Sequence, residues 1–487
     1  MTRSRHNDLF RSLARSFVPA LALMLFSGCA VGPDYQRPEA TTIPDAFVGT
    51  GNDWKVAAPR AHEPRGNWWE IFGDSELNQL EADAMAANQD LKAAVSRFAQ
   101  ARASANVAES ALFPRLGISA SQVDQRDSKH RPVGGKPDQT YDTLTVPFDF
   151  SYEIDLWGRV RRSVEAATAQ AQAGADDIES IKLSIQAEVA ANYISLRTLD
   201  ADNALLHSSI AVYRKSLELV RNRRAGGMIS DLDVAQAETV LKTAEAQAPD
   251  IAIQRARYQN ALAALTGKPA SLFQLPERPL DISPLVIPAG LPSELLERRP
   301  DIAAAERRMA AANANIGVAT AAFFPTVRLS GIAGFQSGGL DMLFDWPSNF
   351  WAVGPSLTLP LFQGGQLNAT LRQTKAVYEE TVAKYRQTVL SAFAEVENNL
   401  SAEHLLADEY QKLLDALQSV RRQLEIADNR YSSGLATYLE VATAQNAALG
   451  IERTGVRLRG QQLVSVAALI KSLGGGWQAP ESNTNGS

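Results

Sequence analysis

Apolar and polar residues alternate along two stretches of the chain, and a period of two predicts β-strands with one apolar and one polar face. The apolar positions of the first stretch are Leu144, Val146, Phe148, Phe150, Tyr152 and Ile154. Those of the second are Val353, Leu357, Leu359 and Leu361, with Pro355 in the same phase. A candidate partner strand precedes each stretch, after Pro114 and after Pro325. We therefore expect two β-hairpins, at about residues 115–156 and 326–362.

Two longer stretches have apolar residues at alternating steps of four and three, which predicts helices packed as coiled coils. These positions are Leu206, Ile210, Tyr213, Leu217 and Val220, and then Leu406, Tyr410, Leu413, Leu417, Val420, Leu424, Ala427 and Tyr431. A helix from about Arg162 to Arg223 would be on the order of 90 Å long at ~1.5 Å per residue. An amphipathic helix in an ordinary globular core has the same periodicity, but this length favours a rod.

Each rod is expected to turn at a glycine-containing tip, at about residues 224–232 and 431–439. Gly227 and Gly434 tolerate the positive φ that ends a helix. Ser230 and Thr437 are candidate N-caps of the following helices. Each long helical segment is therefore predicted to be a helical hairpin.

The two hairpin systems are copies of one duplicated unit. Residue pairs 211 positions apart are identical at Asp90 and Asp301, Arg97 and Arg308, Phe113 and Phe324, and Pro114 and Pro325. Pairs 207 apart are identical at Glu188 and Glu395, Gly227 and Gly434, and Leu232 and Leu439. A repeat of this length indicates a duplicated half-domain. We assign repeat 1 to residues 67–266, repeat 2 to 301–473, and a proline-rich linker between the repeats to 267–300.

The amino terminus is typical of an exported lipoprotein. Four arginines precede a short apolar run, Phe17 to Phe26, and small residues stand just before Cys29. This predicts a signal peptide at 1–28, acylation of Cys29 and an extended tether at 29–66. The alternative is a buried free thiol, but Cys29 directly follows the export signal and is the only cysteine. Residues 474–487 are predicted to form a disordered tail.

Composition and motifs exclude several classes of function. The chain of 487 residues has a net charge of −6, and loss of the arginine-rich signal makes it more acidic, which argues against a nucleic-acid partner. The five histidines are scattered, so we expect no metal site and no cofactor. No motif of a hydrolase, nucleotide-binding or redox enzyme is present, which predicts a protein that is not an enzyme.

Membrane insertion, if it occurs, requires the strands. After the signal there is no run of about 20 apolar residues. Four strands per chain cannot close into a barrel, so several chains would have to share one. The alternative is the edge of a soluble β-sandwich, but the lipoprotein signal favours the membrane.

Several motifs together resemble the outer membrane factor family of tripartite efflux pumps, the TolC-like channels, in their lipoprotein branch of the NodT and OprM type. They are the segment Cys29 to Pro38, Trp68-Trp69, Phe113-Pro114, Asp155-Leu156-Trp157-Gly158, Arg298-Arg299-Pro300-Asp301, Phe324-Pro325 and Leu473-Gly474-Gly475-Gly476-Trp477. The resemblance covers nearly the whole mature chain.

The resemblance implies a mainly α fold with a β-barrel part. A homotrimer would form one 12-stranded β-barrel in the outer membrane, continued by a long periplasmic α-helical coiled-coil barrel. It implies three partners: outer-membrane lipid, a periplasmic adaptor (membrane fusion) protein, and an inner-membrane pump of RND type.

The resemblance also implies site residues at the periplasmic end. Asp233, Tyr431 and Glu440 match the closed gate. The tips that contact the adaptor match Gly227, Ser230, Leu232, Gly434, Thr437 and Leu439. The chain departs from some members at Ala436, where they carry arginine, and at Thr443, where they carry an acid.

We therefore expect a passive exit channel for small molecules. The alternative is a lipid-anchored periplasmic coiled-coil scaffold without a pore. The alternating strands favour the channel, because a scaffold has no use for amphipathic hairpins of bilayer length.

Overall fold

A computed structural model describes residues 30–38, 66–126, 128, 140–279 and 299–475. The chain divides into two compact units. The first comprises Met1–Glu39, Phe98–Gly174 and Ala305–Tyr385, and the second Ala40–Arg97, Ala175–Ala304 and Arg386–Ser487. The expected signal peptide, Cys29, residues 39–65 of the tether, residues 280–298 of the linker and the tail from residue 476 lie outside the described residues.

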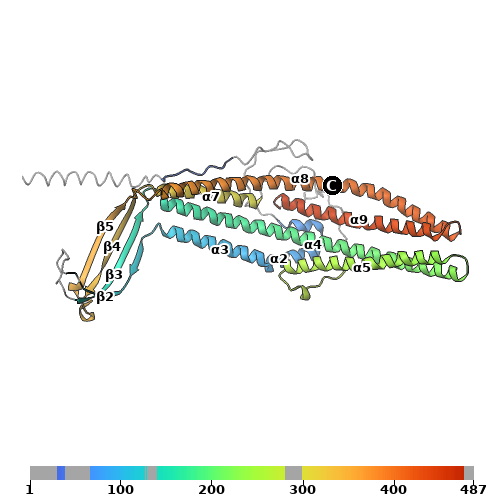
Figure 1. Cartoon of the computed structure of the whole chain (residues 1–487), viewed down its shortest axis with the longest axis horizontal. Helices are drawn as coiled ribbons and strands as arrows, with labels where there is room; N and C mark the ends of the chain where they lie inside the picture. The colour runs from blue at the N-terminus through green and yellow to red at the C-terminus, as the bar shows by residue number, and fades with distance from the viewer. Residues whose placement is uncertain (1–29, 39–65, 127, 129–139, 280–298, 476–487) are drawn as a thin grey trace, which may run out of the picture. The chain divides into compact units, whose positions relative to one another are not determined.

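The first unit contains one antiparallel sheet, in the order β1, β3, β4, β5, with β2 also paired to β3 (Figure 1). The strands are β1 (Arg115–Ile118), β2 (Ser121–Arg126), β3 (Thr140–Ile154), β4 (Thr326–Ser337) and β5 (Asn349–Thr358). β1 and β2 keep one register against β3, with Arg115 opposite Ser151 and Ser121 opposite Thr145. They are thus two segments of a single strand interrupted at residues 119–120, and the sheet is four strands wide.

The two hairpins join through their long strands. β3 and β4 pair along eleven positions, from Leu144 opposite Ser337 to Ile154 opposite Val327. The hairpin of repeat 1 and the hairpin of repeat 2 therefore share one continuous hydrogen-bonded surface. β5 ends at Thr358, so the second hairpin is shorter than the expected range to residue 362, and Leu359 and Leu361 lie beyond the strand.

The helices repeat with the same spacing as the sequence. α4 (Arg159–Ala225) and α8 (Gln366–Ser432) each have 67 residues, and α5 (Asp231–Leu265) and α9 (Tyr438–Ser472) each have 35. Every boundary of the second pair lies 207 positions after its counterpart. α3 (Gln89–Ser110) and α7 (Pro300–Ala321) each have 22 residues, 211 positions apart. Among the described residues, a further helix precedes α3, namely α2 (Ser75–Ala87), and the short 3₁₀ helices are η1 (Trp68–Phe72), η2 (Ala270–Leu272), η3 (Leu340–Met342) and η4 (Trp346–Ser348).

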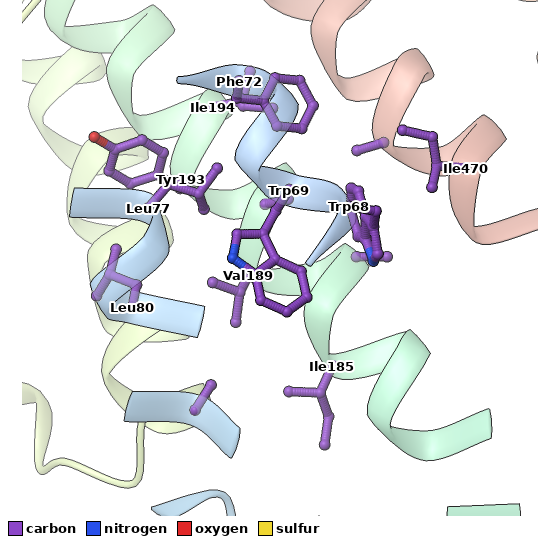
Figure 2. Packing of buried hydrophobic residues seen from close by; sticks show 14 of the residues in the cluster. Trp68, Trp69, Phe72, Leu77, Leu80, Ile185, Val189, Tyr193, Ile194 and Ile470 are labelled. Atoms are coloured by element: carbon purple, nitrogen blue, oxygen red, sulfur yellow. The ribbon is translucent and has the colours of Figure 1, made fainter. Parts of the chain in front are cut away.

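The largest core lies in the second unit, around η1. Trp68 and Trp69 make an edge-to-face contact with ring centroids 6.0 Å apart. Figure 2 shows them beside Val189 and Ile185 of α4, and all four side chains are buried. Full burial of one large apolar side chain stabilises a fold by about 1.5–3 kcal/mol. The aromatic pair that opens repeat 1 is therefore a packing element.

The first part of the linker between the repeats is held against α4 and α5. The buried guanidinium of Arg197 donates through Nη1 to the Pro276 carbonyl (2.7 Å) and to Asp200 (2.7 Å). Arg255 donates to the Leu275 carbonyl (2.8 Å) and also binds Asp200 (2.6 Å). These contacts satisfy the two backbone carbonyls and order the chain where it leaves repeat 1.

Candidate functional site

The two tips of the helical hairpins have the same backbone geometry. At the end of α4, the amide of Met228 donates to the Arg223 carbonyl (3.0 Å) and that of Gly227 to the Arg224 carbonyl (2.9 Å). The equivalent bonds at the end of α8 are 2.8 Å and 3.1 Å. Gly227 and Gly434 have φ of 73° and 74°. This pair of bonds around a left-handed glycine is the Schellman ending of a helix, which explains the glycine in each tip.

Asp233 connects the tip of the first hairpin to the second hairpin. One carboxylate oxygen accepts from the amide (3.1 Å) and hydroxyl (2.8 Å) of Ser230, the residue before α5. The other accepts from the Tyr438 amide at the start of α9 (3.4 Å). The acid therefore both caps its own helix and contacts the neighbouring one.

Glu440, at the matching position of repeat 2, has a different partner. Its carboxylate lies 3.5 Å from Nε of Arg430 in the same hairpin, and both side chains are about half exposed. Thr437, which precedes α9, makes no side-chain cap hydrogen bond. The two candidate gate acids are thus not equivalent, because only Asp233 contacts the other hairpin.

Tyr431 is buried, and within one chain its hydroxyl has no hydrogen-bond partner among the described residues. Tyr431 and Asp233 therefore do not hydrogen-bond to each other within the chain. The Tyr431 ring packs edge-to-face on Tyr438, with centroids 5.5 Å apart. Burial raises the pKa of the Tyr431 hydroxyl, and the nearby Arg223 charge opposes that shift. The hydroxyl therefore stays protonated at neutral pH.

Arg223, which was not among the residues predicted from the sequence, contacts the second hairpin at its tip. Its Nη1 donates to the Tyr431 carbonyl (3.1 Å), and its guanidinium carbon lies 4.7 Å from the centre of the Tyr431 ring. These contacts combine a charge-assisted hydrogen bond with a cation–π interaction. The sequence does contain an indication of this role, because both repeats have an arginine four positions before the tip glycine, Arg223 and Arg430.

The tips expose apolar side chains. Leu232 is 66% exposed and Leu439 is 55% exposed, and both stand in the first turn of the helix that leaves the tip. Met228 and Leu435, within the tips, are also exposed. Matching apolar side chains on two tips form candidate contact positions for another protein.

The sheet in the first unit exposes an apolar face. One row across the four strands consists of Ile118, Phe148, Ala333 and Trp351, and the next of Leu116, Phe150, Gly331 and Val353. Phe148 is 64% exposed and Trp351 is 73% exposed. These rows line a shallow apolar hollow. A contiguous apolar surface of this kind marks a site for lipid or protein.

Other classes of site are not found in the described part of the chain. Within those ranges, no group of three or more His, Cys, Asp or Glu side chains is placed to hold a metal ion. None of the described helices combines the length and apolar character that crossing a membrane requires. Cys29, the expected acylation site, lies outside the described residues.

Comparison with known proteins gives consistent matches over most of the chain. Residues 80–268 and 291–475 match the family model for outer membrane efflux proteins. The toluene efflux pump outer membrane protein TtgF of Pseudomonas putida is 36% identical over 470 residues, which cover 94% of this chain and 96% of that protein. The solved outer-membrane channel OprN has a TM-score of 0.84 at 31% identity and covers 93% of this chain and 100% of its own. VceC of Vibrio cholerae has a TM-score of 0.79 at 34% identity, with 86% of this chain and 100% of its own covered.

Proposed function

The chain belongs to the outer membrane efflux protein family, and from that premise we propose that it is the outer-membrane exit channel of an efflux pump. Its relatives are transport proteins of the outer membrane, among them a toluene efflux component and the channel OprN. The proposed role is passive conduction of small molecules delivered by partner proteins. No catalytic step is part of this role.

The observation that carries the proposal is the four-stranded sheet with its exposed apolar face. In the described residues, the strand made of β1 and β2 pairs only with β3, and β5 pairs only with β4. Both outer edges therefore have unpaired backbone groups, which cannot be left exposed in a bilayer. Three copies joined edge to edge would close 12 strands into one barrel, with the apolar rows facing lipid.

We propose the following organisation for the rest of the chain. Residues 1–28 are removed as a signal, Cys29 is acylated, and 29–66 form the tether. Repeats 1 and 2, residues 67–266 and 301–473, supply the hairpins whose helices form a periplasmic α-barrel in the homotrimer. The tips, through Leu232, Leu439 and their neighbours, contact a periplasmic adaptor that links to an inner-membrane pump of RND type.

We propose that the gate is the set of contacts at these tips, involving Asp233, Tyr431 and Glu440 together with Arg223. At the tips, the charged side chains of Arg223 and Asp233 contact the second hairpin from the first. The hydroxyl of Tyr431 is buried and has no hydrogen-bond partner among the described residues of the chain. A hydrogen bond to a charged group contributes about 1.5–3 kcal/mol. Three copies of each contact could hold the tips closed and still yield to adaptor binding.

Single-channel conductance tests this gate. Tyr431→Phe combined with Asp233→Ala removes the tyrosine hydroxyl and the acid, and should raise the conductance of the trimer in planar bilayers. Arg223→Gln should also raise it. The matched control is Arg421→Gln, because Arg421 pairs with Glu452 within the second hairpin and away from the tips. Equal conductance in Arg223→Gln, Arg421→Gln and the unaltered protein would contradict the assignment.

The channel itself is tested by export and membrane retention in a strain that lacks the endogenous channel. A Cys29→Ser protein should still be retained in the outer membrane, because the shared barrel anchors it without acyl chains. Loss of all membrane association with undiminished export would refute the barrel. Retention that depends entirely on Cys29, with no conductance from the purified protein, would favour the scaffold without a pore.

A further inference from the structure

A cavity of about 590 Å³ lies within the second unit, among helices of both repeats. Its lining residues come from α4, α5, α8 and α9, and belong neither to the tips nor to the sheet. Pockets that bind small organic molecules have volumes of about 300–1,000 Å³. This cavity is therefore large enough for a small ligand.

Two walls of the cavity are made by the same three positions of the two repeats, spaced four residues apart along α5 and α9. Those of α5 are Asp250, Gln254 and Tyr258, and those of α9, 207 positions later, are Arg457, Gln461 and Ser465. A spacing of four places the three side chains on one face of each helix. Both walls have a glutamine, but the acid of one wall is replaced by an arginine in the other. The cavity thus has opposite charges at equivalent positions of the duplicated unit.

The charges of Asp250 and Arg457 do not neutralise each other directly. Nε of Arg457 lies 3.7 Å from Asp202, and the Arg457 side chain is 55% exposed. Asp250 is exposed and accepts a hydrogen bond from the side-chain amide of Gln254 (2.7 Å). Within the described part of the chain, no ion pair joins Asp250 to Arg457. A molecule with one negative and one positive group can therefore bind both walls.

Contacts between α4 and α9 hold the frame of the cavity. Asp202 of α4, whose side chain is 2% exposed, accepts from Nε (2.6 Å) and Nη2 (2.8 Å) of Arg453 of α9. Because this one carboxylate serves both Arg453 and Arg457, the two guanidinium groups retain one positive charge in excess. A Cβ added to Gly460 would clash with the side chain of Thr198, so the glycine allows α9 to lie directly against α4.

Ser465 supplies a hydrogen-bonding group inside the cavity lining. The residue is 9% exposed, and its hydroxyl has no hydrogen-bond partner among the described residues. A buried hydroxyl without a partner is destabilising, so a ligand that binds it gains a contact that the protein does not use. Leu199, Ile251 and Val464 add apolar side chains to the same lining. The cavity thus combines opposite charges, amides, a hydroxyl and an apolar surface.

We propose that the cavity binds a short zwitterionic peptide, namely a dipeptide with an apolar side chain. The guanidinium of Arg457 binds the carboxylate through paired hydrogen bonds, and Asp250 binds the ammonium group. The side-chain amides of Gln254 and Gln461 bind the peptide group, as does the hydroxyl of Ser465. The volume and the amide on each wall favour a dipeptide over a single amino acid, which has no peptide group. This binding is independent of conduction through the channel.

Calorimetric titration of the full-length, detergent-solubilised protein with alanylleucine tests this site. We expect saturable binding. Two blocked forms should each bind about fivefold more weakly, because partly exposed charge pairs contribute modestly. They are N-acetyl-alanylleucine, which lacks the ammonium group, and alanylleucine amide, which lacks the carboxylate. Free leucine should also bind more weakly, because it cannot use the amides of the two walls.

Variants of the two charged residues identify the end of the dipeptide that each one binds. Arg457→Gln should weaken binding of alanylleucine about fivefold and leave the affinity for the amide form as in the unaltered protein. Asp250→Asn should weaken alanylleucine similarly and leave the affinity for the acetylated form unchanged. Arg422→Gln, at an exposed position of α8 outside the cavity lining, is the control and should change no affinity. A merely structural effect of Arg457→Gln or Asp250→Asn would weaken all three ligands alike and would overturn the assignment.

Ser465→Ala separates binding from folding. Because the hydroxyl has no partner among the described residues, urea unfolding should show no loss of stability. The affinity for alanylleucine should nevertheless fall about threefold to tenfold. Unchanged affinity would overturn the role of Ser465.

Absence of saturable binding by the unaltered protein would overturn the site. Equal affinity for leucine and alanylleucine would overturn its assignment to a peptide. Conductance of the same preparation separates this site from the proposed function. A conducting trimer that does not bind alanylleucine refutes the site alone, and binding with the expected pattern by a protein that forms no channel refutes the proposed function alone.

Discussion

Glu81 provides a test of how the α2 region is stabilised, because its carboxyl group is buried without a hydrogen-bond partner. Its side chain is 0% exposed, and neither carboxylate oxygen has a hydrogen-bond partner among the described residues. Its neighbours along α2, Leu77, Leu80 and Ala84, are buried apolar residues. Burial raises the pKa of Glu81 from 4.5 to about 9. The folded protein therefore holds this side chain as a neutral acid at neutral pH.

The sign of the pH dependence follows from linkage. Because the pKa of Glu81 is higher in the folded state, folding takes up a proton between pH 4.5 and about 9. Its contribution to the free energy of unfolding is fully present below pH 4.5 and is lost as the pH rises through about 9. Each pH unit within that window corresponds to ~1.36 kcal/mol. From pH 5 to pH 8 the loss is about 4 kcal/mol per chain.

Glu81→Gln keeps the shape of the side chain and removes the proton equilibrium. We expect the free energy of unfolding of the variant, relative to the unaltered protein, to increase by about 4 kcal/mol between pH 5 and pH 8. Urea unfolding of the detergent-solubilised protein, followed by far-UV circular dichroism at one protein concentration, measures this difference. Glu109→Gln, at an exposed position on α3, is the control, and its free energy of unfolding should change with pH as that of the unaltered protein does. The same pH dependence in Glu81→Gln as in the unaltered protein would refute the reasoning.

Three further changes test other parts of the molecule. Asp202→Ala leaves the guanidinium of Arg453, which Asp202 binds at 2.6 and 2.8 Å, without its buried partner, so urea unfolding should show a loss of about 3–5 kcal/mol. Phe148→Lys puts a charge on the apolar face of the sheet at a cost of about 2–4 kcal/mol in mid-bilayer, and less protein should remain in urea-washed outer membranes. Arg223→Ala removes the contacts to Tyr431, and the conductance of the trimer should rise.

Local patterns in the sequence were sufficient to predict the repeated helices. The boundaries of α4 and α8, and of α5 and α9, follow the same 207-residue spacing as the identical residue pairs. The length of each helix follows from its apolar periodicity, and the glycine at each tip follows from the positive φ that the turn requires. Both features can be recognised within a single segment of the sequence. The pairing of β3 with β4 was not predicted, because it depends on tertiary contacts between strands almost two hundred residues apart.

Partners within the candidate site were harder to predict than its residues. Asp233 and Tyr431 both lie at the tips, but the structure pairs Asp233 with Ser230 and Tyr438, and Tyr431 with Arg223. Which side chain reaches the other hairpin depends on how the two hairpins pack. The sequence of one segment alone does not determine that packing. The same reason applies to the close approach of Gly32 to Gly317, which joins segments 285 positions apart.

The central claim, that three copies of this chain form one pore, is tested most directly by measuring mass and conductance on one preparation. Purified protein is weighed by native mass spectrometry in detergent and then inserted into planar lipid bilayers. We predict the mass of a trimer and discrete conductance steps, both from the acylated protein and from Cys29→Ser. A monomer, or a trimer that binds the bilayer and never conducts, would contradict the account.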